Sequence, residues 1–161
     1  MTNYICINGN KTELTEEQLQ QLGIEIPKVN PFARVNKSNE YLFITSVGEV
    51  GYHRDINDHV DNACFNIANY CTDKAIMEQR ALHETLNRLL WRYSMEHKEN
   101  RDEHKIGGVC IKYTDTKWHV YHFGWSYNIP GIIYFDNERI AENAIEEVIK
   151  PFMAAHPDFK F

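Results

Sequence analysis

Histidine is the residue type in this sequence that most invites metal chemistry, because the chain carries eight of them. Two imidazoles hold one zinc ion only when their ring nitrogens reach the same point. His119 and His122 are three residues apart in a predicted strand, so they point to opposite faces. His53 and His59 flank an acidic segment and could meet in space, but zinc ligands usually show tighter paired spacing. We therefore predict no metal site.

A predicted helix contains His83-Glu84 followed by Asn87, one residue away from a zinc-protease motif. That motif needs two imidazoles four residues apart on one helix face. Asn87 occupies the position of the second imidazole, and an amide is a poor zinc ligand. We interpret the segment as a solvated helix face.

An acidic stretch spans residues 55–62. A helix-flanked calcium loop that starts at Asp55 needs an oxygen ligand at its fifth position, glycine at its sixth and glutamate at its twelfth. Those three positions hold His59, Val60 and Asn66. We interpret the stretch as an acidic surface loop. Its candidate contacts to a basic partner are Asp55, Asp58 and Asp61.

Signatures of nucleotide binding and of a nucleophile are absent from the sequence. No glycine-rich turn leads from a predicted strand into a helix, and no serine has a nucleophile-elbow context. A Cys–His pair stays open, because its members can come from distant segments. The cysteines form no CxxC pair, and we expect free thiols in predicted strands; they are Cys6, Cys64, Cys71 and Cys110. We expect no catalytic residues and no cofactor.

The most informative segment is the predicted strand over residues 117–127, which carries aromatic residues on both faces. One face includes Trp118, Val120 and His122. The other face holds His119, Tyr121, Phe123, Trp125 and Tyr127. Two interpretations stay open: both faces are buried within the monomer, or the second face is a partner surface, a homodimer contact included. The five residues of the second face are the candidate binding residues.

The N-terminal residues 1–30 are predicted to form a strand–helix extension. A strand over residues 3–8 precedes a helix that Thr15 and Gln18 can cap reciprocally and that Gly23 can end. Residues 24–33 are typical of an extended connector.

Two blocks with the order strand–strand–strand–helix follow, over residues 31–97 and 107–161. The first has predicted strands at 41–46 and 49–54 that pair as a hairpin, a strand at 64–70, and a long helix at 74–97 that Thr72 or Asp73 can cap. The apolar stripe of this helix is predicted to comprise Ala75, Leu82, Leu86, Leu89, Leu90 and Tyr93. The second has strands at 108–113, 117–127 and 132–135, with a turn at Asp115-Thr116 between the first two. A helix at 137–150 follows, which Asp136 caps and Pro151 stops. Tyr70-Cys71-Thr72 aligns with Tyr134-Phe135-Asp136, which fits either a duplication or shared capping rules. We predict one α+β domain over 1–161, with an antiparallel sheet built from two β-β-β-α blocks and helices packed on one side.

Composition places the chain among ordinary globular proteins, with 43% hydrophobic residues, 25% charged residues and a net charge of −6. An acidic chain argues against direct nucleic-acid binding, which depends on Lys and Arg. No apolar run is long enough to span a bilayer, and residues 1–9 lack the pattern of a signal peptide. We expect a cytoplasmic protein that does not enter the membrane.

Several packing and capping motifs carry a resemblance. They include Pro31-Phe32-x-Arg34-Val35, Asn69-Tyr70-Cys71-Thr72-Asp73 and the segments 84–94 and 141–153. On these motifs the chain resembles a group of small accessory proteins encoded by phages and prophages of Gram-positive bacteria. The resemblance carries no catalytic residues. It implies a protein that acts by stoichiometric binding to a host protein, as anti-defence and anti-CRISPR inhibitors do.

The expected function is therefore a non-enzymatic inhibitor of a bacterial immune effector, such as a CRISPR–Cas nuclease, in the cytoplasm of the host cell. An alternative is a protein that sequesters a small nucleotide signal, with Arg54, Arg88 and Arg92 as candidate phosphate contacts. A structural or regulatory phage protein is a third possibility.

Overall fold

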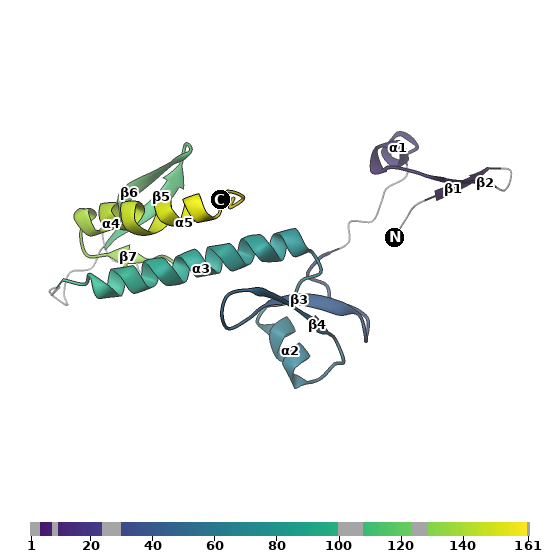
Figure 1. The fold of residues 1–161 in the computed structure, drawn as a ribbon, viewed down its shortest axis with the longest axis horizontal. Coiled ribbons are helices and arrows are strands. Elements are labelled where there is room, and N and C mark those ends of the chain that lie inside the picture. The colour runs from purple at the N-terminus through teal and green to yellow at the C-terminus, as the bar shows by residue number, and fades with distance from the viewer. Residues whose placement is uncertain (1–3, 8–9, 24–29, 100–107, 124–128, 161) are drawn as a thin grey trace. The chain divides into compact units, whose positions relative to one another are not determined.

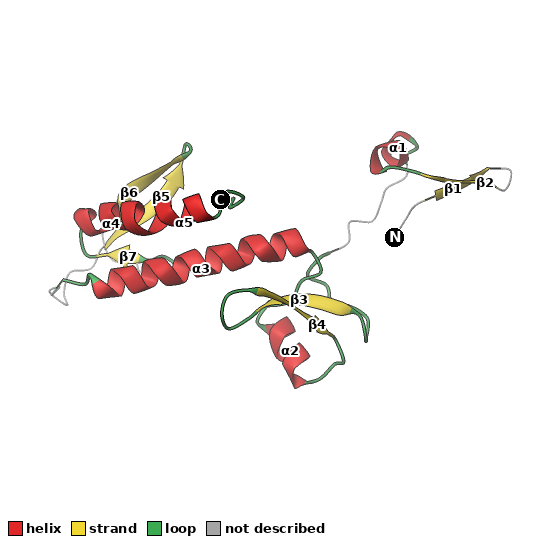
Figure 2. Ribbon diagram, in the orientation of Figure 1, coloured by secondary structure: helices red, strands yellow, loops and turns green. Residues whose placement is uncertain are grey.

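The computed structural model describes residues 4–7, 10–23, 30–99, 108–123 and 129–160, drawn as ribbon in Figures 1 and 2. The chain divides into two compact units, residues 1–33 and 34–161, and each is described by itself. Among the described helices, none combines the length and the apolar character that crossing a membrane requires.

The first unit contains the antiparallel strands β1 (Tyr4–Ile7) and β2 (Asn10–Glu13) and the helix α1 (Glu16–Gln21). The reciprocal cap is confirmed: the Thr15 N–H donates to Gln18 Oε1 at 2.9 Å, and the Gln18 N–H donates to Thr15 Oγ1 at 3.3 Å. Gly23 follows with a φ of 70°, the left-handed conformation that ends helices. Most of the predicted turn after residue 8 and of the connector lies outside the described residues.

The second unit begins with the predicted hairpin, formed by β3 (Glu40–Ile44) and β4 (Val50–Arg54). Gly48 has a φ of 89° in the connecting turn, where its N–H donates to the Thr45 carbonyl. Leu42 and Ile44 are buried on one face of β3 with Met77 and Ala81 of the helix α3 (Lys74–Glu96). Tyr41, on the other face, donates a hydrogen bond to Asp61.

Asp61 belongs to a helix that the sequence did not predict, α2 (His59–Asn66). The predicted strand over 64–70 is therefore wrong, and Cys64 lies in a helix. Figure 1 shows α2 and α3 on opposite sides of the β3–β4 hairpin, so the expectation of helices on one side is also wrong here. The segment after α2 contributes a single antiparallel bridge, between Cys71 and Leu42.

Helix α3 is the long predicted helix, capped by Asp73, whose side chain accepts from the Ile76 N–H at 3.1 Å. It contacts β3 and β4 near its start and the C-terminal helical segment farther along. Its buried residues are Met77, Ala81, Leu86, Leu90 and Tyr93. Ala75 of the predicted stripe is exposed instead, while Leu82 and Leu89 are partly buried.

The second block forms a three-stranded antiparallel sheet in the order β6-β5-β7, from β5 (Gly108–Thr114), β6 (Lys117–Phe123) and β7 (Tyr134–Phe135). The predicted turn at Asp115–Thr116 is confirmed, with φ values of 51° and 65°. Within the described residues the three sheets are separate, so the structure confirms an α+β fold with antiparallel strands but not one continuous sheet.

The C-terminal helical segment departs from prediction in two ways. It consists of α4 (Glu138–Ala144), the π-helical turn η1 (Ile145–Ile149) and α5 (Lys150–Ala155). Asn137, not Asp136, caps it, with Asn137 Oδ1 accepting from the Ile140 N–H at 2.9 Å. Pro151 does not stop the helix, because the π turn places it in the first turn of α5, where its missing N–H has no helical partner to lose.

Candidate functional site

Two of the three predicted surface acids are buried. Asp55 is 1% exposed and Asp61 is 0% exposed, and they are the buried charged residues among the described positions. The prediction of an acidic surface loop is therefore wrong for both, and neither can contact a partner. Asp58 is half-buried at the N-terminus of α2, where it caps the helix.

Asp55 accepts hydrogen bonds on both carboxylate oxygens. Arg34 Nε donates to Oδ2 at 2.8 Å and Arg34 Nη2 donates to Oδ1 at 3.1 Å, a bidentate pair. The Tyr70 hydroxyl donates to Oδ2 at 2.9 Å, and the Asn57 N–H donates to Oδ1 at 2.8 Å. Four donors saturate this carboxylate, so no lone pair remains for a substrate proton or a metal.

Asp61 is held in a similar way. The Tyr41 hydroxyl donates to Oδ1 at 3.0 Å, and the N–H groups of Ile56 and Asp58 donate to Oδ2 at 2.8 and 3.1 Å. His53 lies at the edge, with its Nε2 3.5 Å from Oδ1. The Tyr41 and Tyr70 rings stack between the two carboxylates, with centroids 4.0 Å apart. We call this set the polar network; its side chains are Arg34, Tyr41, Asp55, Asp61, Asn62 and Tyr70.

The protonation states of the network follow from these contacts. The hydrogen bonds from Arg34 lower the pKa of Asp55 to about 2. Burial alone raises the pKa of Asp61, but the N–H groups of Asp58 and Ile56 outweigh it and hold the pKa below its ordinary value. Burial, aided by Asp55, raises the pKa of Tyr70. Both acids are therefore ionised and both phenols are neutral donors at pH 7.

This arrangement fixes the inward face of α2. The Asn62 side chain accepts from Arg34, and the Phe65 ring meets the Tyr70 ring edge-on at 5.4 Å. The Arg34 guanidinium also lies over the Phe65 ring, 5.7 Å from its centroid. Charged and amide groups on one side of α2 are thereby directed toward the protein.

The opposite side of α2 carries exposed apolar residues beside the exposed polar residues His59 and Asn66. Residues at steps of three and four share a helix face, and Ile67, the residue just after the helix, continues this face. We call it the outer stripe; it comprises Val60, Ala63 and Ile67. Val60 is 44% exposed and Ile67 is 68% exposed. An ordinary amphipathic surface helix packs its apolar face on the protein and exposes its polar face. In α2 the buried residue is Asp61 and the apolar stripe is exposed, and we call this orientation inverted.

The structure describes only part of the predicted aromatic face of β6. Trp118 and Val120 pack against the larger apolar cluster, whereas His119 and Tyr121 are exposed. The second face of β6 is therefore not buried within the monomer at these two residues. The Phe123 side chain, Trp125 and Tyr127 lie outside the part of the chain that the structure describes, so their role stays a prediction.

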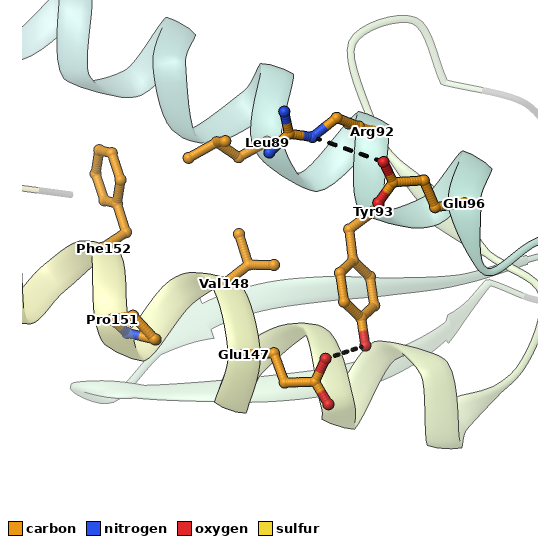
Figure 3. Close-up of a pocket in the computed structure, with 8 residues that line it drawn as sticks. All are labelled: Leu89, Arg92, Tyr93, Glu96, Glu147, Val148, Pro151 and Phe152. Carbon is orange, nitrogen blue, oxygen red and sulfur yellow. Dashed lines mark hydrogen bonds and ion pairs between the residues drawn. The ribbon is translucent and has the colours of Figure 1, made fainter.

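A pocket of about 250 Å³ lies between α3 and the C-terminal helical segment (Figure 3). Its apolar walls come from Leu89, Val148, Pro151 and Phe152. Tyr93 donates to Glu147 Oε2 at 3.0 Å, and Arg92 Nε lies 3.9 Å from Glu96 Oε1. The two carboxylates in this lining disfavour a phosphate group.

The residues considered for other chemistry are engaged elsewhere. Arg54 and Arg88 each lie near a carboxylate, Arg54 3.9 Å from Glu40 and Arg88 3.5 Å from Glu84. The His83 ring lies 2.8 Å from the Lys160 carbonyl, at the helix face predicted to be solvated. Within the described ranges no three His, Cys, Asp or Glu side chains are grouped to hold a metal ion. The four cysteines are free thiols.

Sequence reasoning missed the polar network and the outer stripe together. The local signal was the spacing Asp58-x-x-Asp61, since the Asp58 side chain accepts from the Asp61 N–H while Asp61 accepts from the Asp58 N–H. That pattern begins a helix at residue 59 and excludes a strand at residue 64. No local signal identified Arg34, Tyr41 or Tyr70 as partners.

Comparisons of the chain with models of known protein families, with curated proteins and with solved structures found no match.

Proposed function

We propose that this protein acts by binding another protein, and that the outer stripe of α2 is its docking element. The observation that carries the proposal is the inversion of α2, which directs Asp61 and Asn62 inward and leaves Val60 and Ile67 in solvent. Single exposed apolar residues are ordinary, but an apolar row on one helix face is typical of an element that docks into a groove.

Binding is favoured over catalysis because the acids of the site are occupied. A general base needs a free lone pair within reach of its substrate. Both carboxylate oxygens of Asp55 already accept hydrogen bonds, from Arg34, Tyr70 and Asn57. The hydrogen bonds of Asn62 with Arg34 and of Asp61 with Tyr41 hold α2 in one orientation. A preorganised helix loses little conformational freedom on docking, which favours affinity.

The finer proposal is that the partner is a bacterial immune effector, such as a CRISPR–Cas nuclease, which this chain inhibits stoichiometrically in the host cytoplasm. Its support is the resemblance of the packing and capping motifs to accessory proteins of phages and prophages. With Asp55 and Asp61 buried, the docking contact is apolar at its centre, and the net charge of −6 contributes long-range attraction to a basic partner.

The test is a titration of the purified chain into a DNA-cleavage assay of Cas nucleases from Gram-positive bacteria, combined with direct binding measurements. Val60→Ser with Ile67→Ser is expected to weaken binding at least about tenfold while the fold is kept. Val47→Ser is the matched control, because Val47 is 77% exposed in the β3–β4 turn but lies outside the stripe.

Equal binding by the stripe variant and by wild type would contradict α2 as the docking element. An absence of inhibition across such nucleases would remove the finer proposal. A nucleotide that raises the melting temperature of the free chain would favour the sequestration alternative instead.

A further inference from the structure

The pocket between α3 and the C-terminal helical segment has an apolar end and a polar end (Figure 3). Leu89, Val148 and Phe152 line the apolar end, and Tyr93 and Glu147 lie at the polar end. Its volume of about 250 Å³ corresponds to roughly eight water molecules, and hence to an organic molecule of similar size. Concave sites with apolar walls and a few convergent polar groups are typical of small-ligand binding.

The π-helical turn η1 shapes one wall of this pocket, since it contains the lining residues Glu147 and Val148. The Lys150 N–H bonds to a carbonyl five residues earlier, instead of the four-residue step of an α-helix. In the same pattern the Glu146 carbonyl would accept from residue 151, but Pro151 has no N–H. The turn is therefore less well bonded than a continuous α-helix. Such turns inside helices are found frequently at functional sites.

Tyr93 holds the polar end of the pocket in place. The residue is 8% exposed, and its hydroxyl donates to Glu147 Oε2 at 3.0 Å. Burial, aided by Glu147, raises the pKa of Tyr93, so the phenol stays a neutral donor. This bond uses one oxygen, and within the described ranges no second donor reaches the Glu147 carboxylate. Glu147 is therefore an oriented anion with acceptor capacity left for a ligand.

The charges of the lining favour a cation as the ligand. The carboxylates of Glu96 and Glu147 give two negative charges and the Arg92 guanidinium gives one positive charge, which leaves one net negative charge. Arg92 Nε lies 3.9 Å from Glu96 Oε1, so Arg92 is paired with Glu96. In the part of the chain that the structure describes, Glu147 has no such cation beside it. A positively charged ligand would supply it.

We infer that this pocket binds a small organic cation, a primary ammonium group carried on an apolar body. The ammonium donates to the unused oxygen of Glu147, and the apolar body lies along Leu89, Val148 and Phe152. A primary ammonium has three donors, so it can bond to Glu147 and stay hydrated at the pocket mouth. A neutral ligand of the same shape lacks the charge-assisted hydrogen bond, and both carboxylates repel an anion. This inference goes beyond the proposed docking function and does not depend on it, because no residue of α2 lines the pocket.

The test is an NMR titration of the full chain with phenethylammonium chloride, whose cation joins a primary ammonium to an aromatic ring. We expect saturable shifts of the Leu89 and Val148 methyl signals, with a dissociation constant of about 1 mM. The methyl signals of Val60 and Ile67, on the outer stripe, are expected to stay unchanged. Phenethyl alcohol is the matched neutral probe, and we expect it to bind at least about tenfold more weakly.

Two variants test the carboxylate itself. Glu147→Gln keeps the size of the side chain, and we expect it to raise the dissociation constant of phenethylammonium at least about tenfold while that of the alcohol is unchanged. Glu146→Gln is the matched control, because Glu146 accepts from Lys150 Nζ at 2.7 Å and does not line the pocket. It is expected to change the constant by less than about twofold. Shifts that do not saturate, shifts confined to other methyl signals, equal binding of the alcohol, or equal binding by Glu147→Gln would each overturn the inference.

Discussion

The two strand–helix blocks of residues 34–161 use different interactions at the same structural position. In the second block the space between sheet and helix is apolar, with Val109, Phe135 and Ile140 in one buried cluster. In the first block one face of β3 is also apolar, but the other face meets α2 through the polar network. A polar network around buried carboxylates can therefore hold a helix with its apolar side chains outward, which an apolar core cannot do.

The pairing pattern of the two blocks makes this comparison a close one. In each block the first strand pairs with the second strand and with the segment just before the helix, as Leu42 does with Cys71 and Val109 does with Phe135. Cys71 and Phe135 are also the residues aligned in the two sequences. Among the described residues, helix α2 of the first block has no counterpart in the second block.

The largest expected effect on stability lies in the second block, whose core is apolar. Phe135→Ala removes a ring that is 1% exposed, and we expect it to lower the free energy of unfolding by about 4 kcal/mol. Because no charge is involved, urea denaturation at pH 7 and at pH 3 is expected to give the same loss. A loss that disappears at pH 3 would show that this block also depends on ionised groups.

In the first block, replacing one carboxylate by an amide is expected to lower the free energy of unfolding. Asp55→Asn leaves the Arg34 guanidinium, 28% exposed in its side chain, without its carboxylate, and we expect a loss of about 3 kcal/mol at pH 7. Glu40→Gln is the control, because Glu40 and Arg54 form an exposed pair 3.9 Å apart that contributes less than about 0.5 kcal/mol. Similar small losses in both variants would contradict the role of the network.

A single hydroxyl gives a smaller effect. Tyr70→Phe removes the donor to Asp55 and the acceptor of the Val35 N–H, which lies 3.1 Å from the hydroxyl oxygen. We expect a loss of about 1.5 kcal/mol, measured by urea denaturation at pH 7. Tyr52→Phe, on an exposed ring of β4, is expected to change stability by less than about 0.5 kcal/mol.

Acid is expected to weaken the first block through Asp55. A carboxyl whose pKa is lowered in the folded state stabilises the fold above its unfolded pKa near 4, and this contribution is lost as the pH falls toward about 2. We expect Asp55 to contribute about 1 kcal/mol in this window, since Arg34 is partly solvated. The stability difference between wild type and Asp55→Asn should shrink from pH 5 to pH 2; a constant difference would exclude this linkage.

Elements with a local signal could be predicted from the sequence. The reciprocal cap of Thr15 and Gln18 and the turn at Asp115–Thr116 each depend on neighbouring residues, and both were predicted. For α3 the sequence left Thr72 and Asp73 open as caps, and the structure has Asp73. Pro151 misled because a proline normally ends a helix, and the π turn that accommodates it has no reliable sequence pattern.

The candidate site could be predicted only in part. Asp55 and Asp61 were identified as a group, but their burial depends on Arg34, Tyr41 and Tyr70, which lie 15 to 21 residues away in the sequence. Rules that use only neighbouring residues predict that an acidic segment without a basic partner nearby in the sequence is exposed to solvent. The apolar residues of α2 were wrongly predicted to belong to a strand, because a short apolar run fits a buried strand as well as it fits an exposed helix.

The inverted orientation of α2 can be tested by comparing the stability of two substitutions on its opposite faces. Asp61→Asn replaces a carboxylate whose oxygens accept from Tyr41, Ile56 and Asp58, so we expect it to lower the free energy of unfolding by about 2 kcal/mol. Ile67→Ser, on the outer stripe, is expected to change it by less than about 0.5 kcal/mol. A larger loss for Ile67→Ser than for Asp61→Asn would contradict the account, because it would place the apolar face of α2 inside the protein.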